Sequence, residues 1–219
     1  MAKIKSKSEL NDTIDEDLAT RKYEISFLIN LLEDKKTHRM AKVLAKALVI
    51  IAYAHWEGFV KLSSARYLSY VNFLSIPKCD MNSHLHAVGI TWFGDVCGLS
   101  KSNVVHEIHN ILCNDSYKLS FPIDPLVSTE SNLNSEVLKK ILADIGSDTK
   151  EFDNDFAFID KKLLKYRNKY AHGEAQYADI EEALMIGNNV IILLNKYRDM
   201  LQNMIATEQY RRIPVSPLS

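Results

Sequence analysis

The chain contains few of the residues that form turns. Seven glycines and five prolines occur in 219 residues, less than half of their combined share of about 12% in an average protein. A long chain with few turn-forming residues favours long helices over many short strands. The sequence therefore predicts an all-α fold. Since it contains no linker or internal repeat, residues 1–219 are expected to form a single domain with its core at about residues 40–205.

The chain also lacks an excess of charge of either sign and has no long apolar run. The 27 basic and 28 acidic residues leave a net charge of −1, so a site for a polyanion must be a local patch. The most apolar run, residues 43–54, is shorter than the roughly 20 residues that cross a membrane. No signal-peptide pattern follows the first lysines, and three cysteines without close spacing favour a reducing compartment. We expect a cytoplasmic protein that spans no membrane.

The apolar periodicity divides the chain into helices. They are expected at residues 8–33 (with a possible break near Thr20), 38–74, two within 82–114, 135–145, 155–171 and 180–212, with a tail at 213–219. The second is apolar on most sides over residues 43–54, which marks it as the central helix. Asn134 and Asp179 are expected N-caps, and Gly146 a helix stop. Residues 115–132 change to a loop with room for a short strand pair.

The end of the helix over residues 155–171 carries the most informative residues. Arg167 and Asn168 are followed by His172 and Gly173, so a guanidinium, an amide and an imidazole lie near a helix C-terminus. At about 100° per residue, Asn168 and His172 share one face. An apolar stripe on another face consists of Phe156, Ile159, Leu163, Tyr166 and Tyr170. The lysines of this helix predict a local phosphate-binding patch: Lys161, Lys162, Lys165 and Lys169.

The run from Arg167 to Glu174 resembles the signature of the HEPN superfamily, whose members are helical bundles and in many cases ribonucleases. Residues 54–61 and 132–138 are similar to landmarks of a HEPN branch found with bacterial toxin and defence systems. The resemblance implies a metal-independent endoribonuclease without a cofactor. It also implies a homodimer in which two motifs face each other across bound RNA, and a neutralising partner: an antitoxin protein, or an enzyme that modifies Tyr170 or a neighbour.

RNA cleavage gives each motif residue a chemical task. The 2′-hydroxyl beside each phosphate is the nucleophile, and the products would carry 2′,3′-cyclic phosphate and 5′-hydroxyl ends. His172 would move the proton, Arg167 would hold the phosphate oxygens, and Asn168 would orient either side chain. Glu57, on the central helix, could position Arg167 or His172.

Structural roles for the same residues stay open. His172 could be a helix cap, Arg167 could pair with Asp160 or Glu174, and Glu57 could be an ordinary surface charge. A HEPN module could also bind nucleotide or a partner protein without cleaving, and a plain helical interaction protein is a further alternative.

Two other clusters of residues give weaker indications of function. His106, His109 and Cys113 share a helix face and are acceptable zinc ligands, but no Cys-x2-Cys pair supports them, so no metal site is expected. The basic run at residues 35–46 could extend the RNA surface; a solvated helix start is the favoured interpretation.

Overall fold

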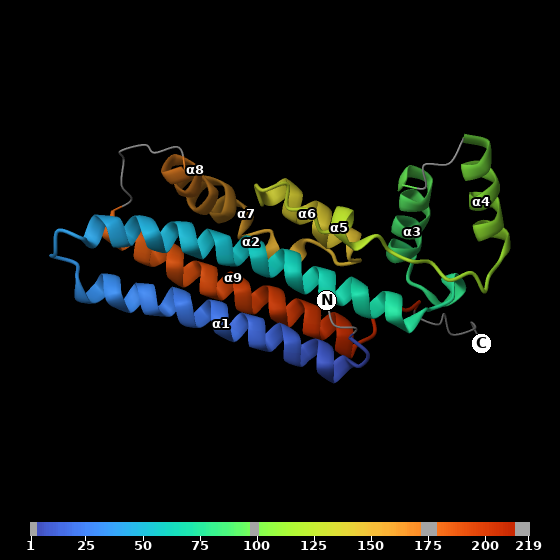
Figure 1. Cartoon of the computed structure of the whole chain (residues 1–219), viewed down its shortest axis with the longest axis horizontal. Helices are drawn as coiled ribbons and strands as arrows, with labels where there is room; N and C mark the ends of the chain where they lie inside the picture. Colours follow the sequence, from blue (N-terminus) through green and yellow to red (C-terminus); the bar gives the residue numbers. More distant parts are fainter. Residues whose placement is uncertain (1–3, 97–100, 172–178, 213–219) are drawn as a thin grey trace.

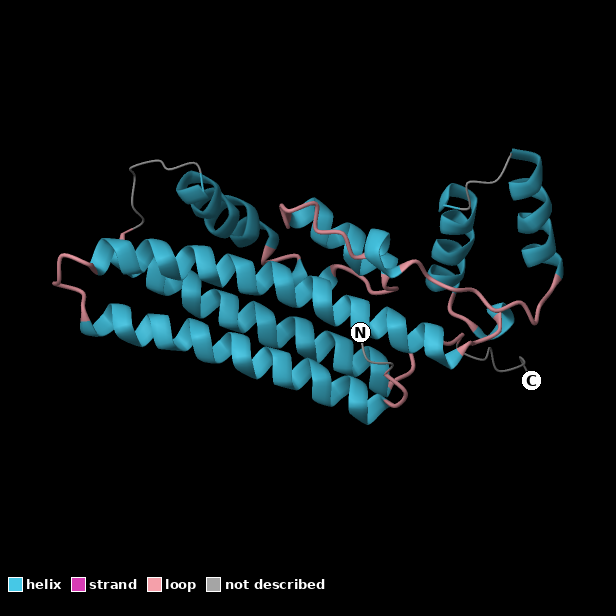
Figure 2. Ribbon diagram, in the orientation of Figure 1, coloured by secondary structure: helices cyan, strands magenta, loops and turns pink. Residues whose placement is uncertain are grey.

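The computed structural model describes residues 4–96, 101–171 and 179–212. Three long helices run side by side along the molecule (Figure 1): α1 (Lys7–Asp34), α2 (Ala41–Leu74) and α9 (Ile180–Ala206). Figure 2 shows that, within the described residues, every regular element is helical. The all-α prediction is therefore confirmed.

Shorter helices cover one side and one end of this bundle. The hairpin of α3 (Ser83–Val96) and α4 (Lys101–Cys113) stands at one end. Along α2 lie α5 (Ile123–Leu126), α6 (Ser135–Asp144), α7 (Phe156–Phe158) and α8 (Lys165–Ala171). In Figure 1, α8 lies at the opposite end of the bundle from α3 and α4.

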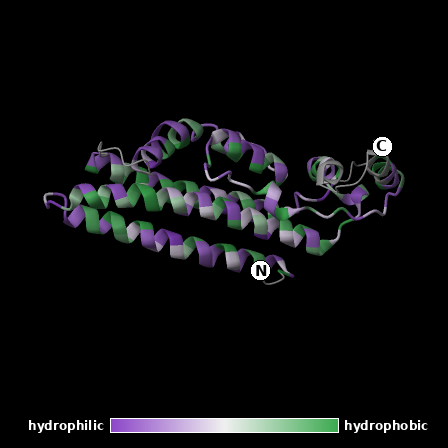
Figure 3. Cartoon of the chain, turned by 45° about the horizontal axis from the view of Figure 1, so that its top comes forward, coloured by the Kyte–Doolittle hydropathy of each residue, from purple (hydrophilic) through white to green (hydrophobic). Residues whose placement is uncertain are grey.

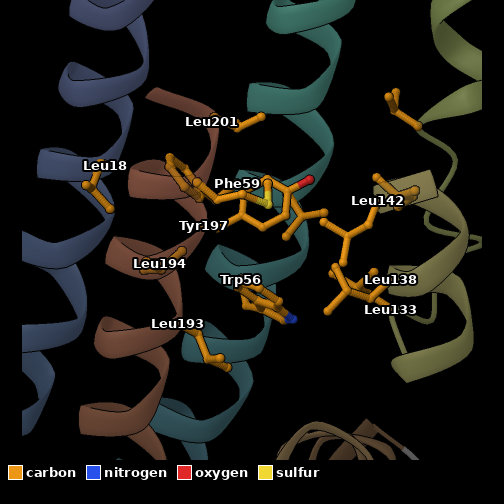
Figure 4. Close-up of a cluster of buried hydrophobic side chains, with 14 of the residues drawn as sticks. Leu18, Trp56, Phe59, Leu133, Leu138, Leu142, Leu193, Leu194, Tyr197 and Leu201 are labelled. Carbon is orange, nitrogen blue, oxygen red and sulfur yellow. The ribbon is translucent and has the colours of Figure 1, made fainter. Parts of the chain in front are cut away.

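The core is organised around α2, as the sequence predicts for its central helix. Trp56 and Phe59 of α2 and Tyr197 of α9 are fully buried. The Tyr197 ring meets the Trp56 ring edge-on, with the ring centres 5.9 Å apart. Figure 4 shows these rings between leucines from α1, α6 and α9. Figure 3 shows apolar and polar residues alternating along the long helices, as expected for helices that bury one face.

α2 is also long and apolar enough, by length and composition, to cross a membrane. In this fold, 44% of its 18-residue apolar window is buried inside the molecule. Its packing against α1 and α9 accounts for the apolar composition.

The predicted helix boundaries near α6 and α9 are confirmed by their capping geometry. The Asn134 side chain accepts a hydrogen bond from the Val137 N–H, and the Asp179 side chain accepts one from the Ile180 N–H. Gly146 has a φ of 84°, which glycine adopts without steric cost. The N–H of the next residue, Ser147, then reaches back to the Leu142 carbonyl, which terminates α6 as a Schellman motif.

Several predicted boundaries were wrong. α1 is continuous through Thr20, whose hydroxyl donates to the Glu16 carbonyl. α2 begins at Ala41, after a turn, rather than at residue 38. α9 ends at Ala206 rather than near residue 212, because Glu208 turns to a φ of 51°. The described loop 115–132 contains α5 and an isolated bridge between Pro77 and Lys118 instead of a strand pair.

The helix that carries the motif also differs from the regular α-helix predicted. Between α7 and α8 the backbone forms a π-helical segment, η3 (Ile159–Leu164). The wider i to i+5 turns of a π-helix insert an extra residue, so the adjacent leucines Leu163 and Leu164 are both buried. The predicted apolar stripe nevertheless faces the core: Ile159, Leu163 and Tyr170 are buried, and the partly buried Phe156 and Tyr166 pack against it.

Candidate functional site

Helix α8 places Arg167 and Asn168 next to each other as a hydrogen-bonded pair. Arg167 Nη1 donates a 2.8 Å hydrogen bond to Asn168 Oδ1. Both side chains are half-buried. The Asn168 amide is thus in direct contact with the guanidinium of Arg167. His172 and Glu174 lie outside the described residues.

Two elements distant in sequence hold the other sides of the Arg167 guanidinium. Its Cζ lies 4.8 Å from the centre of the Tyr53 ring on α2, within the range of a cation–π contact. Its Nη2 donates a 3.1 Å hydrogen bond to the backbone carbonyl of Ser131, in the loop before α6. Sequence reasoning missed both partners. The only signal was indirect, since each lies next to a stretch, residues 54–61 or 132–138, that resembles a HEPN landmark.

The loop before α6 is itself attached to both neighbouring helices. The Leu133 N–H donates a 2.7 Å hydrogen bond to the Tyr53 hydroxyl. The N–H and hydroxyl of Ser135 both donate to the carboxylate of Asp160 in η3. Asp160 is therefore engaged by Ser135, and among the described residues it forms no ion pair with Arg167, so that alternative role for Arg167 is wrong.

Glu57 is half-buried one turn after Tyr53 on α2. No ion pair links Glu57 to Arg167 in the part of the chain described, so Glu57 does not hold the arginine directly. It acts instead on Tyr53: burial first, and then the negative charge of Glu57, raise the pKa of the Tyr53 hydroxyl to about 12. Tyr53 is consequently a neutral hydroxyl at physiological pH.

His55, one position from this face, is engaged elsewhere. Its Nε2 lies 3.0 Å from Glu24 Oε2 on α1, and burial lowers the pKa of its imidazole although Glu24 opposes the shift. This contact links α1 to α2, a structural role.

Tyr170 is buried, with 3% of its surface exposed. Its ring packs against that of Tyr166, and Lys46 Nζ of α2 lies 5.5 Å from its centre. An enzyme that modified Tyr170 would therefore need the last turn of α8 to open. The contact between Lys46 and the Tyr170 ring also brings the basic run at residues 35–46 beside α8.

The four predicted RNA-binding lysines differ in their surroundings. Lys161 and Lys165 are exposed, whereas Lys169 is half-buried. Lys162 forms an ion pair with Glu182 of α9, to which the Tyr166 hydroxyl also donates. That hydrogen bond raises the pKa of Tyr166 to about 12. Burial raises the pKa of Glu182, but the hydrogen bonds from Lys162 and Tyr166 outweigh it and the net pKa is lowered. Glu182 thus masks one cation of the patch.

Two of the three residues considered as zinc ligands, His109 and Cys113, are neighbours on α4. His109 Nε2 lies 3.6 Å from Cys113 Sγ, and both side chains are exposed. Across the described residues, no group of three or more potential ligands comes together.

Comparison with known families identifies the family of the chain. The family model RiboL-PSP-HEPN matches residues 16–203, from the middle of α1 almost to the end of α9. No curated protein and no solved structure matches the chain. The matched region contains the whole motif and the Tyr53 and Ser131 partners of Arg167. The chain belongs to the RiboL-PSP-HEPN family of the HEPN superfamily.

Proposed function

We propose that the protein is a metal-independent endoribonuclease that cleaves RNA through the 2′-hydroxyl. Membership of the HEPN superfamily suggests a nuclease or an RNA-related module. The observation that carries the proposal is the support of Arg167 from three directions, by Asn168, Tyr53 and Ser131. Hydrogen bonds to the described residues use Nη1 and Nη2 once each, so a guanidinium with five N–H donors keeps others for a phosphate.

The reaction needs one proton removed and one supplied. The 2′-hydroxyl loses its proton to His172 and attacks the neighbouring phosphorus, while Arg167 stabilises the charge that develops on the non-bridging oxygens. The bond to the 5′-oxygen then breaks, and that oxygen takes up a proton. The products carry 2′,3′-cyclic phosphate and 5′-hydroxyl ends. One histidine can take part in only one of these proton transfers at a time. In a homodimer, the histidine of the second motif performs the other transfer.

RNA would approach along the basic side of η3 and α8. Lys161 and Lys165 are exposed there, and Lys46 lies alongside on α2. Phosphate contacts of this kind bind RNA without reading its sequence. We infer that these lysines, with Lys169, place the strand over Arg167, and that Lys162 joins them once its ion pair with Glu182 is released.

Cleavage of a labelled single-stranded RNA in EDTA tests the proposal. Wild type should leave 2′,3′-cyclic phosphate ends, and His172→Ala should lower the rate of cleavage by about 10²- to 10⁴-fold. A matched control is His84→Ala, an exposed histidine on α3 at the other end of the molecule. If His172→Ala cleaves as fast as wild type, or if cleavage stops in EDTA, the proposal is wrong.

The homodimer has its own test. We expect light scattering to give a particle of about twice the chain mass of 25.0 kDa. Mixing Arg167→Ala with His172→Ala subunits should restore part of the activity, because each mixed dimer retains one arginine and one histidine. A fully active monomer would rule out the facing motifs.

A cytoplasmic toxin or defence nuclease with a neutralising antitoxin is the setting we propose for this activity. Co-expression provides the check: the wild type should arrest growth of its host, and His172→Ala should not.

The second candidate is a HEPN module that binds nucleotide or a partner protein without cleaving. The intramolecular contacts of Arg167 favour it, since an arginine held in this way can be purely structural. No cleavage by wild type, together with saturable nucleotide binding that Arg167→Ala abolishes, would establish it.

A further inference from the structure

Tyr53 contacts both Arg167 itself and the loop segment that carries Ser131, another support of Arg167. It is 2% exposed in the middle of α2. Its ring lies under the guanidinium, with Cζ 4.8 Å from the ring centre. Its hydroxyl accepts the Leu133 N–H at 2.7 Å, and Leu133 follows two residues after Ser131, whose carbonyl accepts from Arg167.

The loop that presents this carbonyl has a costly backbone conformation. Glu130 and Ser131 have φ angles of 53° and 56°, in the left-handed region that side chains with a Cβ rarely adopt. Two such residues in succession persist only where the surroundings hold them, and they concentrate at functional sites.

Three attachments hold the loop in place. The Asn132 N–H donates to the Thr129 carbonyl at 2.9 Å within the loop. After the turn, the Leu133 N–H is bonded to Tyr53 and Ser135 is bonded to Asp160. Of the two hydrogen bonds in this set that reach another helix, the one to Tyr53 is closer in sequence to Ser131.

We propose that Tyr53 is a positioning residue for Arg167, which it fixes by its ring directly and by its hydroxyl through the Leu133–Ser131 segment. The effect on cleavage rests on the proposed ribonuclease function; the effect on the guanidinium does not. The Tyr53 hydroxyl accepts the Leu133 N–H through its oxygen, and it does so in its neutral form, consistent with the raised pKa of Tyr53.

Neither the ring nor the hydroxyl of Tyr53 would be sufficient alone to position Arg167. Phenylalanine keeps the ring under Arg167 but leaves the buried Leu133 N–H without its acceptor. Leucine removes both contacts. The two substitutions therefore separate the direct effect from the effect through the loop.

The test measures the guanidinium and the reaction separately. In a ¹⁵N-arginine-labelled protein, the Arg167 side-chain signal is assigned by its loss in Arg167→Lys, and the Tyr53 ring current should displace it. Tyr53→Leu should abolish that displacement and lower kcat about 10²-fold, with KM changed by less than about twofold, as expected for a misplaced catalytic group. Tyr53→Phe should keep the displacement, speed exchange of the guanidinium protons and lower kcat by about tenfold.

Tyr70→Leu is the matched control, because Tyr70 is a buried tyrosine of the same helix that packs edge-on against Tyr210. It should lower the melting temperature without moving the Arg167 signal. The proposal is overturned if Tyr53→Leu leaves that signal in place, or if Tyr70→Leu has the same effect on signal and kcat. Should Tyr53→Leu fail to fold, unchanged exchange and kcat in Tyr53→Phe would overturn it. If wild type does not cleave RNA, the proposed function fails, and the Arg167 signal alone decides the role of Tyr53.

Discussion

Asp160 accepts two hydrogen bonds from Ser135, one from its N–H at 2.8 Å and one from its hydroxyl at 2.6 Å. Ser135 is the first residue of α6, and Asp160 lies in the π-helical segment before α8. A single carboxylate therefore joins the start of one helix to the helix that carries the motif. It also places a negative charge at the N-terminus of α6, where the helix dipole favours it.

Removal of this carboxylate should destabilise the protein. Asp160→Ala leaves the Ser135 N–H without its partner, which should cost about 1–3 kcal/mol, whereas Asp160→Asn keeps one acceptor and should cost less. Urea unfolding measures both, and Ser135→Ala, which removes one bond of the two, should fall between wild type and Asp160→Ala. Equal midpoints for wild type and Asp160→Ala would show that the contact contributes nothing.

Glu182→Gln should strengthen RNA binding by releasing Lys162. In the non-cleaving His172→Ala background, we expect Kd to fall about two- to fivefold at low salt. The slope of the logarithm of the association constant against the logarithm of the salt concentration should steepen by about 0.7, the value for one further phosphate contact with a single strand. Fluorescence anisotropy over a salt series measures both quantities.

The control for that experiment is Glu181→Gln. It changes the net charge equally and releases Lys36, at a largely exposed ion pair. An equal gain in affinity from both variants would mean that only overall charge matters and that Lys162 does not contact RNA.

Two adjacent buried serines of α2 should respond differently to alanine. Ser64 Oγ donates to the Val60 carbonyl and lies 2.6 Å from the fully buried Tyr197 hydroxyl. Since its one proton is used, Tyr197 donates to it, and Ser64→Ala should cost about 1–3 kcal/mol because that hydroxyl loses its partner. Ser63 only bonds to the Phe59 carbonyl one turn back, so Ser63→Ala should change stability by less than about 0.5 kcal/mol. Thermal unfolding would contradict this interpretation if the two variants melted together.

Asp144→Asn should stabilise the protein above pH 6 but not at low pH. Burial raises the pKa of Asp144 from 3.8 to about 6, against the opposing charge of Lys140. The folded state therefore holds this proton more tightly than the unfolded state, so stability falls as the pH rises from about 4 to about 6 and stays lower above that range. The charged carboxylate also ends α6, where the helix dipole disfavours it.

We expect a melting temperature about 2 °C higher for Asp144→Asn at pH 8, a small gain because solvent screens this half-exposed group. The difference should vanish near pH 4. Asp153→Asn, at an exposed aspartate, serves as the control and should show no such pH dependence. A gain that is the same at pH 4 and pH 8 would assign the effect to something other than ionisation.

Much of the local structure was predictable from the sequence because its causes lie within a few residues. The Asn134 and Asp179 caps and the Gly146 stop depend on side chains that bond to the backbone of the same turn. The central place of α2 follows from the apolar run at residues 43–54. Arg167 and Asn168 were identified as a pair from adjacent positions in a recognisable motif, and their hydrogen bond is local.

The surroundings of the motif were not predictable, because they depend on contacts between distant segments. A π-helical segment before α8 replaces the regular α-helix that the apolar periodicity predicts. Glu182 of α9 pairs with Lys162 of η3, and Lys46 lies over Tyr170 because α2 passes beside α8. Charge and residue type along a chain do not determine which of these side chains meet.

The sequence by itself determined an all-α chain, its family and the residues of its motif, since periodicity, caps and short motifs are local properties. Only the tertiary structure decided how Arg167 is held, by the ring of Tyr53 and the carbonyl of Ser131. A backbone carbonyl carries no sequence signal, and a cation–π contact needs only a ring at the right distance. Both therefore depend on how α2, the loop before α6 and α8 pack together.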